Sequence, residues 1–590
     1  MFAARKARRD VASTGSSSVS TMEASPRATT GEDSGRSQCL DALAVAINQA
    51  YDAREWYTSS KELQLASLEL CGACRGAHTV HLMVEADTPT TLLAISGARR
   101  ANSEEGVPLR VPRLRARRVT WALPSVKLLS NRFDSLAEVE ELYFDVVFGG
   151  RLESREWPSG RRRRDSSRPP DMNETIIGVA WPSSLQRLTF GPSFNQPIEG
   201  VTWPSSLIQL KLGSDFNQRV ERVTWPATLQ QLTFGFDFNR PLEGVAFPPS
   251  LLLLRFGYCF NQRVERVTWP ASLQQLTFGH DFNRQLEGVA FPPSLLRLSF
   301  GFSFNQPIGR VDWPRSLQIL TFWGAFDQPI RGTTWPASLQ ALFFGERFNQ
   351  PTGGVTWPTS LEEIHYGFDF NQPIDGVTWP ASLLRLNLGM AFDRSIQGVT
   401  WPNFLEDLAF GHAFNQPIAG VAWPESLLRL TFGGLFDQPI AGVTWPPLMQ
   451  KLSLGSSFNQ PIISAKWPVS LKQLTFEGAF NQPIEGVAWP PSLEELAFGK
   501  DFDQPIDGRE GPSTLRRLVL GGEFRHSLEN LGAVMPSLER LELYVQLDTV
   551  RCDLLQRIHW PTKLTHLKVA KNADLEGLSI PRSVAVICQD

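Results

Sequence analysis

Apolar residues recur along most of this chain with the spacing of a short strand repeated many times. Leu185, Leu188 and Phe190 form one such stripe, and a polar residue separates the last two, as in a strand with one buried face. The stripe returns at a period of 22 residues, for example at Leu273 and at Leu493. One stripe is too small to form a core alone, so we expect the strands to stack in register as a parallel sheet.

A tryptophan followed by proline marks each unit, with phenylalanine in place of tryptophan twice. Proline fixes φ and has no N–H, so we expect an extended outer side at this corner, with neither a central strand nor a continuous helix. The aromatic side chains would then fill the space between this outer side and the sheet. The alternative is a stripe of sugar-binding platforms. The fifteen aromatic positions are Trp181, Trp203, Trp225, Phe247, Trp269, Phe291, Trp313, Trp335, Trp357, Trp379, Trp401, Trp423, Trp445, Trp467 and Trp489.

After each strand the chain reaches a phenylalanine followed by asparagine or aspartate, as at Phe194-Asn195 and Phe216-Asn217. Asparagine accepts left-handed backbone conformations and bonds readily to nearby backbone groups. Stacked copies would form a ladder of side chains that satisfies amides at the bend. The alternative, exposed ligand-binding asparagines, would leave those amides without partners.

The unit, in its fullest form LxxLxFGxxFNQPIxGVTWPxS, resembles the FNIP repeat, a relative of the leucine-rich repeats found mainly in protist and algal proteins. The resemblance covers about residues 139–525. It implies a leucine-rich-repeat-like solenoid and protein interaction, and it brings no shared catalytic residues. Some relatives carry a kinase domain, but this sequence lacks the glycine-rich loop and the catalytic motifs that follow it. The residues that recur together are Phe194, Asn195, Pro197, Ile198, Pro204, Leu207 and Leu210.

The predicted fold is mainly β, a right-handed leucine-rich-repeat-like solenoid of 22-residue coils with a parallel sheet on its inner face and a small α/β N-terminal cap. The cap is expected to contain helical segments at Leu40–Tyr51 and Lys61–Leu70, and strands at Thr79–Glu85 and Thr90–Ile95. A last strand is expected at Val584–Ile587. The regions are 1–38, a disordered tail; 39–118, the cap; 119–180, irregular first coils with an Arg-rich insertion; 181–525, the regular array; and 526–590, degenerate C-terminal coils.

Charge and cysteine content narrow the class of partner and the compartment. A net charge of −3 gives no basic surplus for nucleic acid. Six cysteines in 590 residues do not suggest a disulfide framework, so we expect a cytoplasmic protein. A nuclear location, or an organelle reached through the Arg- and Ser-rich N-terminal segment, is the alternative. No apolar run is long enough for a membrane span.

Large aromatic residues follow the strands in several neighbouring units, where the inward pattern does not require them. They are expected to form an exposed apolar patch that another protein binds. The alternative is that they only shield the edge of the sheet. The predicted partner-binding residues are Phe236, Tyr258, His280, Phe302, Trp323 and Phe368.

Other candidate sites favour no enzyme, cofactor or metal. Asp215 and Asp237 occupy equivalent positions in adjacent units, as a glycosidase pair might require, with Asp281 two units later. Solvated surface carboxylates are the simpler interpretation, because no cleft or separate acid accompanies them. His280 and His412 are six units apart, too far to share a metal.

Cys71, Cys74 and His78 offer three zinc ligands without a clear fourth. The Arg161–Arg164 run is a solvated loop, a nuclear import signal or a phosphate contact. The sequence therefore predicts a protein–protein interaction scaffold that binds through its exposed sheet face, with a carbohydrate-binding or glycan-acting solenoid and a structural spacer as alternatives.

Overall fold

The computed structural model describes residues 176–506, 511–544, 557–570 and 580–589, and five earlier strands without their side chains. The expected tail at 1–38, the helix at Leu40–Tyr51 and the Arg161–Arg164 run lie outside the described residues. The strands are β1 (Ala66–Leu68), β2 (Thr79–Glu85), β3 (Thr90–Ser96), β4 (Arg118–Ala122), β5 (Glu141–Phe144), β6 (Arg187–Phe190), β7 (Gln209–Lys211), β8 (Gln231–Thr233), β9 (Leu253–Arg255), β10 (Gln275–Thr277), β11 (Arg297–Ser299), β12 (Ile319–Thr321), β13 (Ala341–Phe343), β14 (Glu363–His365), β15 (Arg385–Asn387), β16 (Asp407–Ala409), β17 (Arg429–Thr431), β18 (Lys451–Leu454), β19 (Gln473–Phe476), β20 (Glu495–Ala497), β21 (Arg517–Leu520), β22 (Arg540–Leu543), β23 (His566–Ala570) and β24 (Ala585–Gln589).

These strands form one 24-stranded sheet. From β4 to β24 each strand pairs in parallel with the next along the chain. In the regular array the register equals the repeat, so that Leu276 lies beside Leu254 and Leu298. The predicted solenoid of 22-residue coils is therefore confirmed.

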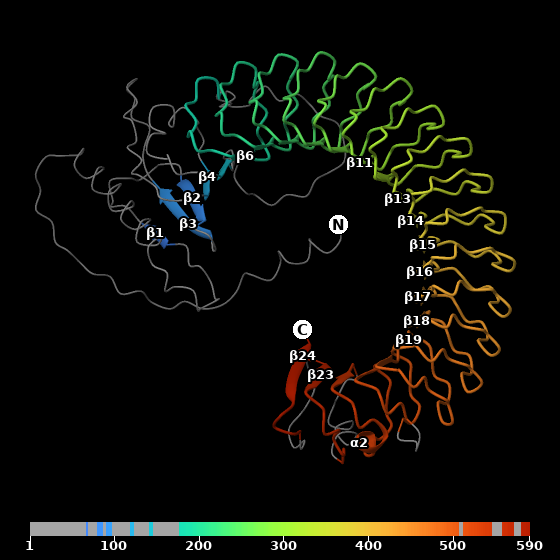
Figure 1. The fold of residues 1–590 in the computed structure, drawn as a ribbon. Coiled ribbons are helices and arrows are strands. Elements are labelled where there is room, and N and C mark those ends of the chain that lie inside the picture. Colours follow the sequence, from blue (N-terminus) through green and yellow to red (C-terminus); the bar gives the residue numbers. More distant parts are fainter. Residues whose placement is uncertain are drawn as a thin grey trace, which may run out of the picture.

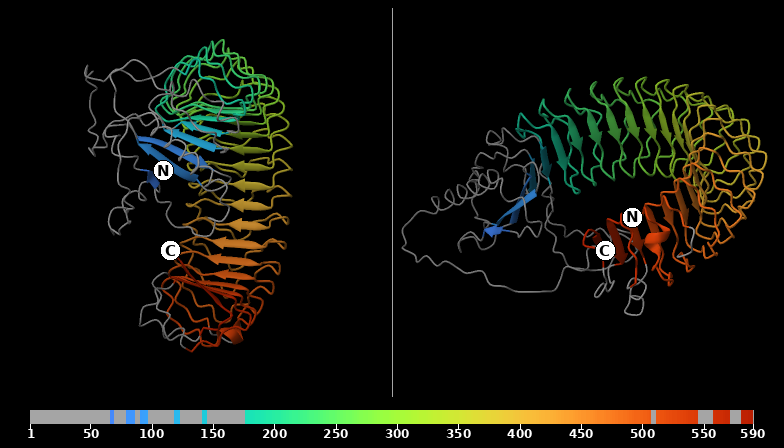
Figure 2. Two further views of the ribbon diagram at one scale, coloured as in Figure 1. Left: turned by 90° about the vertical axis from the view of Figure 1, so that its left-hand side faces the viewer. Right: turned by 60° about the horizontal axis from the view of Figure 1, so that its bottom comes forward.

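The coils stack into a curved body whose sheet lines the inner, concave side, while the loops form the outer rim (Figure 1). The strands lie side by side like the rungs of a ladder along this concave side (Figure 2). Strand backbones repeat at about 4.8 Å. The outer tryptophan rings repeat at a larger distance, 6.2 Å between Trp181 and Trp203. The coils are thus thicker outside than inside, and stacking them bends the body toward the sheet.

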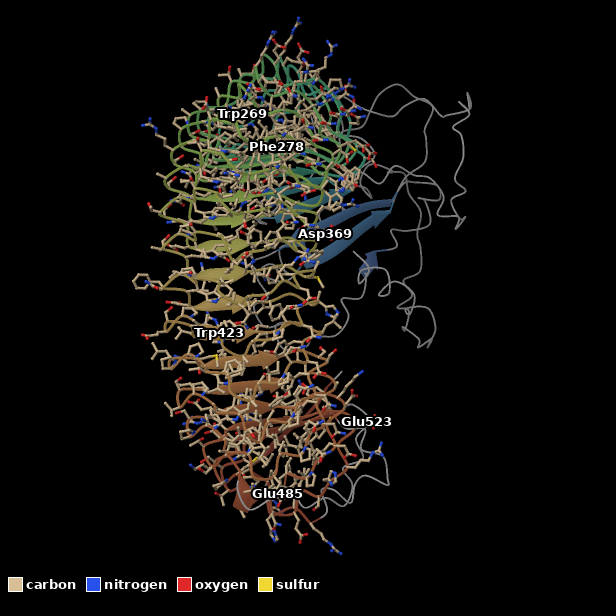
Figure 3. The ribbon with its side chains drawn as sticks, turned by 90° about the vertical axis from the view of Figure 1, so that its right-hand side faces the viewer. Trp269, Phe278, Asp369, Trp423, Glu485 and Glu523 are labelled. Carbon is tan, nitrogen blue, oxygen red and sulfur yellow. The ribbon has the colours of Figure 1, made fainter. Side chains whose placement is uncertain are left out.

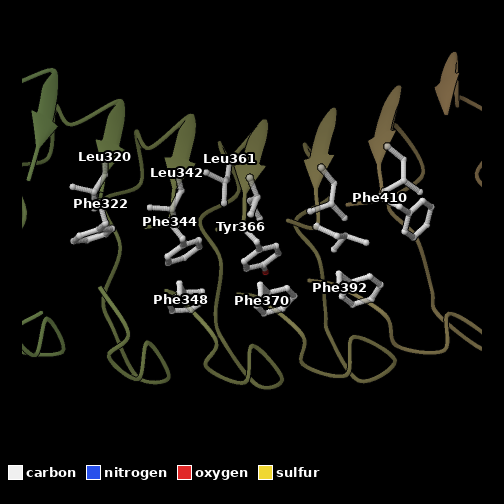
Figure 4. Close-up of a cluster of buried hydrophobic side chains, with 14 of the residues drawn as sticks. Leu320, Phe322, Leu342, Phe344, Phe348, Leu361, Tyr366, Phe370, Phe392 and Phe410 are labelled. Carbon is white, nitrogen blue, oxygen red and sulfur yellow. The ribbon is translucent and has the colours of Figure 1, made fainter. Parts of the chain in front are cut away.

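Phenylalanine columns fill the interior between the sheet and the outer wall. The phenylalanine that precedes each turn stacks on its counterpart in the next coil, with ring centroids 6.0–6.2 Å apart from Phe194 to Phe524. Figure 4 shows this column at Phe348, Phe370 and Phe392, below the leucines of the strands.

The tryptophans close this core from the outer side. Trp269 meets Phe278 edge to face, with centroids 6.4 Å apart, and both residues are buried. The tryptophan column is therefore core packing rather than a sugar-binding platform. Phe247 and Phe291 keep the packing where tryptophan is replaced.

The asparagine ladder predicted from the sequence is present and continuous. In each coil the Oδ1 atom accepts the backbone N–H of the equivalent residue one coil later, from Asn195 to Asp503. In most coils the glutamine that follows the asparagine of the next coil adds a second donor. Gln306 Nε2, for example, lies 2.8 Å from Asn283 Oδ1. Aspartate serves equally as acceptor, for example at Asp327. The asparagines are structural.

The glycine after each strand is required because neighbouring coils approach very closely there. A Cβ atom built on Gly257 would stand 1.6 Å from the carbonyl oxygen of Gly235, and the same clash recurs along the array. The two exceptions are Trp323 and Glu477. At both, the following residue is a glycine with positive φ, Gly324 or Gly478. The turn is displaced by one residue without losing its glycine.

One polar pair lies inside this apolar core. Tyr366 replaces a core phenylalanine and is buried, and Thr352, on the outer wall of the preceding coil, is fully buried. Burial raises the pKa of the Tyr366 phenol far above its usual value, and the adjacent Thr352 hydroxyl lowers it only slightly. Neither hydroxyl has a well-formed hydrogen bond. The pair thus occupies positions that other coils fill with apolar side chains.

The ends of the array depart from the regular pattern. The predicted strands near Thr79–Glu85 and Thr90–Ile95 are β2 and β3, which pair antiparallel. The prediction of a helix at Lys61–Leu70 is wrong at Ala66–Leu68. These residues form the strand β1, which pairs with β3. Sheet pairing with a non-local strand overrides the local helical pattern there.

Beyond the regular coils, β5 pairs directly with β6. At the other end, the short helix α2 (Leu531–Val534) interrupts the outer side of a coil. The expected last strand is present as β24, paired with β23.

Replacing Asn283 by alanine should lower the free energy of unfolding by about 1–3 kcal/mol, because the amide of Asn305 and the side chain of Gln306 lose their acceptor. Asn283→Asp is the matched control, since aspartate accepts the same bonds at Asp327. It should stay within about 0.5 kcal/mol of the wild type. Urea titration of the full chain measures both variants. Equal losses in the two variants would contradict the structural role.

The double variant Thr352→Val/Tyr366→Phe should raise the free energy of unfolding by about 1–2 kcal/mol, because it removes two poorly bonded buried hydroxyls. Valine already fills this position at Val220 and Val264. A double-mutant cycle, measured by urea titration, should also show coupling of about 1 kcal/mol between the two sites. A double variant less stable than either single variant would disprove this account.

Candidate functional site

Four of the six predicted partner-binding residues form one continuous stack of rings on adjacent coils. Phe236 lies 4.5 Å from Tyr258, Tyr258 lies 3.9 Å from His280, and His280 lies 4.9 Å from Phe302, measured between ring centroids. The rings are nearly parallel, within 13°. We call these four residues the aromatic row. It follows the C-terminal ends of β8 to β11.

Hydrogen bonds hold the middle of the aromatic row in place. The hydroxyl of Tyr258 lies 3.2 Å from Nε2 of His280, and Nδ1 of His280 lies 2.8 Å from the Asp281 carboxylate. Both imidazole nitrogens therefore have partners, and the ring cannot rotate without breaking one of these contacts. The row is a fixed surface feature rather than a set of independent side chains.

The stacking decides which parts of the rings are available to a partner. The two inner rings, Tyr258 and His280, have both faces covered by their neighbours. The outer face of Phe302 lies against Gly324, where a Cβ atom, if present, would come within 2.3 Å of the ring. Tyr258, His280 and Phe302 therefore expose mainly ring edges, and Phe302 is 38% exposed. Phe236, at the end of the stack, has a neighbouring ring of the row on one face only and is 47% exposed. An apolar ridge of ring edges suits contact with a protein surface.

The other two predicted residues lie apart from the aromatic row. Trp323 is 57% exposed and Phe368 is 52% exposed, and neither has a ring contact with the row among the described residues. Trp323 follows β12 and Phe368 follows β14. Asp369 and Glu523, at equivalent positions in different coils, lie on the same lateral edge of the solenoid (Figure 3). Phe368, next to Asp369, is part of this edge.

The concave face differs in charge along its length. From β7 to β13 its outward strand positions include the basic residues Lys211, Arg255 and Arg297 and no acidic residue. Those three form no ion pair within the described parts of the chain. From β14 onward several outward charges form ion pairs with the next strand, such as Glu363 with Arg385 at 2.9 Å. The first half of the face is thus free to attract acidic groups.

The strongest ion-pair cluster joins β20 to β23. Arg517 lies 2.8 Å from Glu542 and 3.3 Å from Glu495, and Lys568 lies 3.8 Å from Glu542. Burial raises the pKa of Glu542, but hydrogen bonds from Arg517 and Tyr544 outweigh it, so the pKa is lowered overall. This cluster stabilises the C-terminal coils.

The aspartates considered as a glycosidase pair lie on the surface beside the aromatic row. Asp215 and Asp237 are both exposed, and Asp281 bonds to His280. Cys259, between Asp237 and Asp281, has its thiol pKa raised by burial and by those two carboxylates. A thiol in this environment stays protonated and is a poor nucleophile. The arrangement gives an acidic border to the row.

No group of three potential metal ligands occurs among the residues whose placement is described. Cys71, Cys74 and His78 lie outside those residues. His412 lies on the same lateral edge as His280, against Gly434. Within the described ranges, no helix is long and apolar enough to cross a membrane.

An open groove of about 480 Å³ lies on the other lateral edge, before the strands, and its lining includes Lys472, Glu494, Arg516 and Lys563. Sequence reasoning missed it, because it depends on side chains that meet only through the stacking of five coils. Alternating charges at one repeat position were the available signal, at Lys472, Glu494 and Arg516.

The FNIP-repeat family matches the chain eight times, at residues 173–215, 194–237, 216–259, 260–303, 304–347, 436–479, 458–501 and 480–509. No protein with a curated description matches. Among solved structures, CroV588, described as a novel circular leucine-rich-repeat protein, is 30% identical with a TM-score of 0.53. The match covers 77% of this chain and 76% of that one.

Two further solved structures are more distant. An internalin, InlF from Listeria monocytogenes, is 13% identical over 51% of this chain and 83% of its own, with a TM-score of 0.34. The Toll–Spätzle complex from Drosophila gives 13% identity over 65% of this chain and 60% of the matched chain, with a TM-score of 0.41.

Arg517→Met should lower the free energy of unfolding at neutral pH by about 1 kcal/mol, because Glu495 and Glu542 lose their partner. Since pairing lowers the pKa of Glu542, its stabilising effect is present above the unfolded pKa and is lost as pH falls through the lower folded value. The difference from wild type should therefore shrink on acidification. Urea titrations at several pH values measure it, with Arg540→Met as the control.

Proposed function

We propose, because the chain belongs to the FNIP-repeat family of leucine-rich-repeat-like solenoids, that it is an interaction scaffold whose concave face and aromatic row bind another protein. A solenoid of this kind offers a long surface whose inward residues are fixed by stacking and whose outward residues are free to vary. The cytoplasm is the proposed location, because six cysteines in 590 residues do not suggest a disulfide framework. The observation that carries the proposal comes from two nearly identical stretches within the chain.

Residues 216–259 and 260–303 are 44-residue copies that differ at seven positions. Eight positions of each copy face outward from a strand or directly follow its glycine turn, and five of the seven differences fall there. The other 36 positions hold only two differences, although many of them are exposed on the outer side. The five pairs are Phe236/His280, Leu253/Arg297, Arg255/Ser299, Tyr258/Phe302 and Cys259/Ser303.

This distribution favours binding over the spacer alternative. Drift would spread the differences over every exposed position, including those on the outer rim. Instead they gather on the concave face and the adjoining edge, where the aromatic row lies. Surfaces that recognise partners vary in this way while the scaffold beneath them is kept.

The geometry of the aromatic row favours a protein partner over a glycan. Sugars bind aromatic residues by lying on ring faces, but the faces between neighbouring rings of the row are covered, and so is the outer face of Phe302. Protein interfaces instead bury apolar ridges in shallow grooves, with aromatic residues as anchors. The basic residues Arg255 and Arg297 on one side and the carboxylate of Asp237 on the other would fix the orientation of the partner.

The triple variant Phe236→Ser/Tyr258→Ser/Phe302→Ser should weaken partner binding at least ten-fold, because it removes three ring edges from the interface. Serine occupies the same repeat position at Ser214 and Ser456, so the coils should remain folded. Partners recovered by affinity purification with wild-type chain would be identified by mass spectrometry. Each would then be produced pure and titrated against both proteins by calorimetry.

Phe368→Ser is the matched control, since it removes an exposed aromatic residue from the same repeat position outside the row. Circular dichroism should be unchanged in all variants. A purified partner that binds the triple variant as tightly as the wild type would contradict the proposed surface. A glycan array with specific binders that the triple variant loses would favour the carbohydrate alternative instead.

A further inference from the structure

A row of hydroxyl groups runs along the lateral edge that precedes the strands. In twelve coils a serine or threonine hydroxyl donates to a backbone carbonyl just before the strand of the preceding coil, as from Ser382 to Leu361 at 2.8 Å. The acceptor is a leucine in eleven of them and Met449 in the other. We call this the hydroxyl row, and each of its bonds ties one coil to the one before. Its donors are Ser206, Thr228, Ser250, Ser272, Ser294, Ser316, Ser338, Ser360, Ser382, Ser426, Ser470 and Thr514.

In two further coils Phe404 and Leu448 replace the hydroxyl residue. Neither can donate the bond, so the carbonyls of Leu383 and Leu427 lose it. Both side chains point into solvent, with Phe404 63% exposed and Leu448 55% exposed. The chain thus gives up a structural hydrogen bond twice and exposes a large apolar side chain each time. Packing within the fold does not account for either residue.

More apolar residues surround these two. Leu384 and Leu428 occupy the outward position just before the strand in the coils on either side of Glu406, whose backbone N–H donates to the carbonyl of Leu384 and whose carbonyl accepts from the N–H of Leu428. Val469, 68% exposed, adjoins Leu448, because the hydroxyl of Ser470 bonds to the carbonyl of Pro447 at 2.7 Å. The apolar edge, as we call it, consists of Leu384, Phe404, Leu428, Leu448 and Val469.

We propose that the apolar edge is a docking site for an amphipathic helix of a partner protein, lying along the solenoid axis. The spacing supports a helix. Phe404 and Leu448 are two coils apart, or about 10 Å at the strand spacing. Residues i and i+7 on one face of a helix are about 10.5 Å apart. Apolar residues on such a face therefore meet both side chains in turn.

Charge supports a helix that carries basic residues beside its apolar face. Glu406 and Glu425 flank Phe404, and neither carboxylate forms an ion pair within the described part of the chain. Lysine or arginine on the flanks of the docked helix would pair with them. The partner is thus specified by chemistry as a basic amphipathic helix.

The apolar edge is separate from the aromatic row. The row follows the C-terminal ends of its strands, whereas the edge precedes the N-terminal ends, so the two lie on opposite lateral sides. About four coils also separate Phe302 from Leu384 along the axis. Loss of one surface should leave the other intact.

The test uses a fluorescein-labelled amphipathic peptide with leucines at i, i+4, i+7 and i+11 and lysines on the flanks. The comparison peptide has the same composition with the leucines spread around the helix. Fluorescence anisotropy with the full chain should show at least ten-fold tighter binding of the amphipathic peptide. The double variant Phe404→Ser/Leu448→Ser should lose at least ten-fold in affinity for it.

These substitutions restore the hydroxyl row, so the urea midpoint of the double variant should equal or exceed that of the wild type. A loss of binding therefore cannot be attributed to unfolding. Glu406→Gln/Glu425→Gln should weaken peptide binding and reduce its salt dependence. The triple variant of the aromatic row should bind the peptide as the wild type does, which separates this proposal from the proposed function.

Equal binding of both peptides, or unchanged affinity in the double variant, would overturn the proposal. Sedimentation of the chain alone provides a further check. If the wild type self-associates and the double variant does not, the edge is an interface between copies of this chain and the helix proposal is wrong.

Discussion

Each coil must satisfy its own buried groups through contact with an identical group about one strand spacing away. Most features of the array follow from this constraint. The side chain of Asn283 accepts a hydrogen bond from the backbone N–H of Asn305 in the next coil. Its own backbone N–H donates to the side chain of Asn261 in the preceding coil. The phenylalanine columns repeat for the same reason, since a ring stacks best on a ring of the same kind and position. A residue that stacks well on its own copy is therefore favoured in every coil.

The same constraint sets the curvature and leaves some positions free. Aromatic rings require more than 6 Å per coil on the outer side, whereas hydrogen-bonded strands require about 4.8 Å. The sheet therefore lies on the inside of the curve, and its outward side chains converge on one concave surface. Those outward positions carry no stacking duty. They are free to hold charges, as at Arg255 and Arg297.

Much of this fold could be predicted from the sequence because the repeat tests each position many times. The inward leucines, the ladder at Asn195 and the tryptophan core were all predictable from fifteen concordant units. The stacking within the aromatic row was not, because it depends on ring orientation and on the bond between Tyr258 and His280. The second donor to most of the ladder side chains, a glutamine of the next coil, was missed as well. β1 was mispredicted because its residues take their strand from pairing with β3 rather than from their own periodicity.

In a solenoid of this kind, departures from the repeat carry more information about function than agreement with it. Phe404 and Leu448 show why. A neutral substitution in the hydroxyl row would be small or polar, because a large apolar side chain in solvent gains nothing in the folded state and its coil loses a hydrogen bond. Two such losses near each other, flanked by Leu384 and Leu428, are more easily explained by a partner that covers them. Because each coil contacts only its neighbours, such a surface can arise on one edge without disturbing the aromatic row on the other. The two proposed surfaces would thus allow one chain to hold two different partners at once, with little energetic coupling between them.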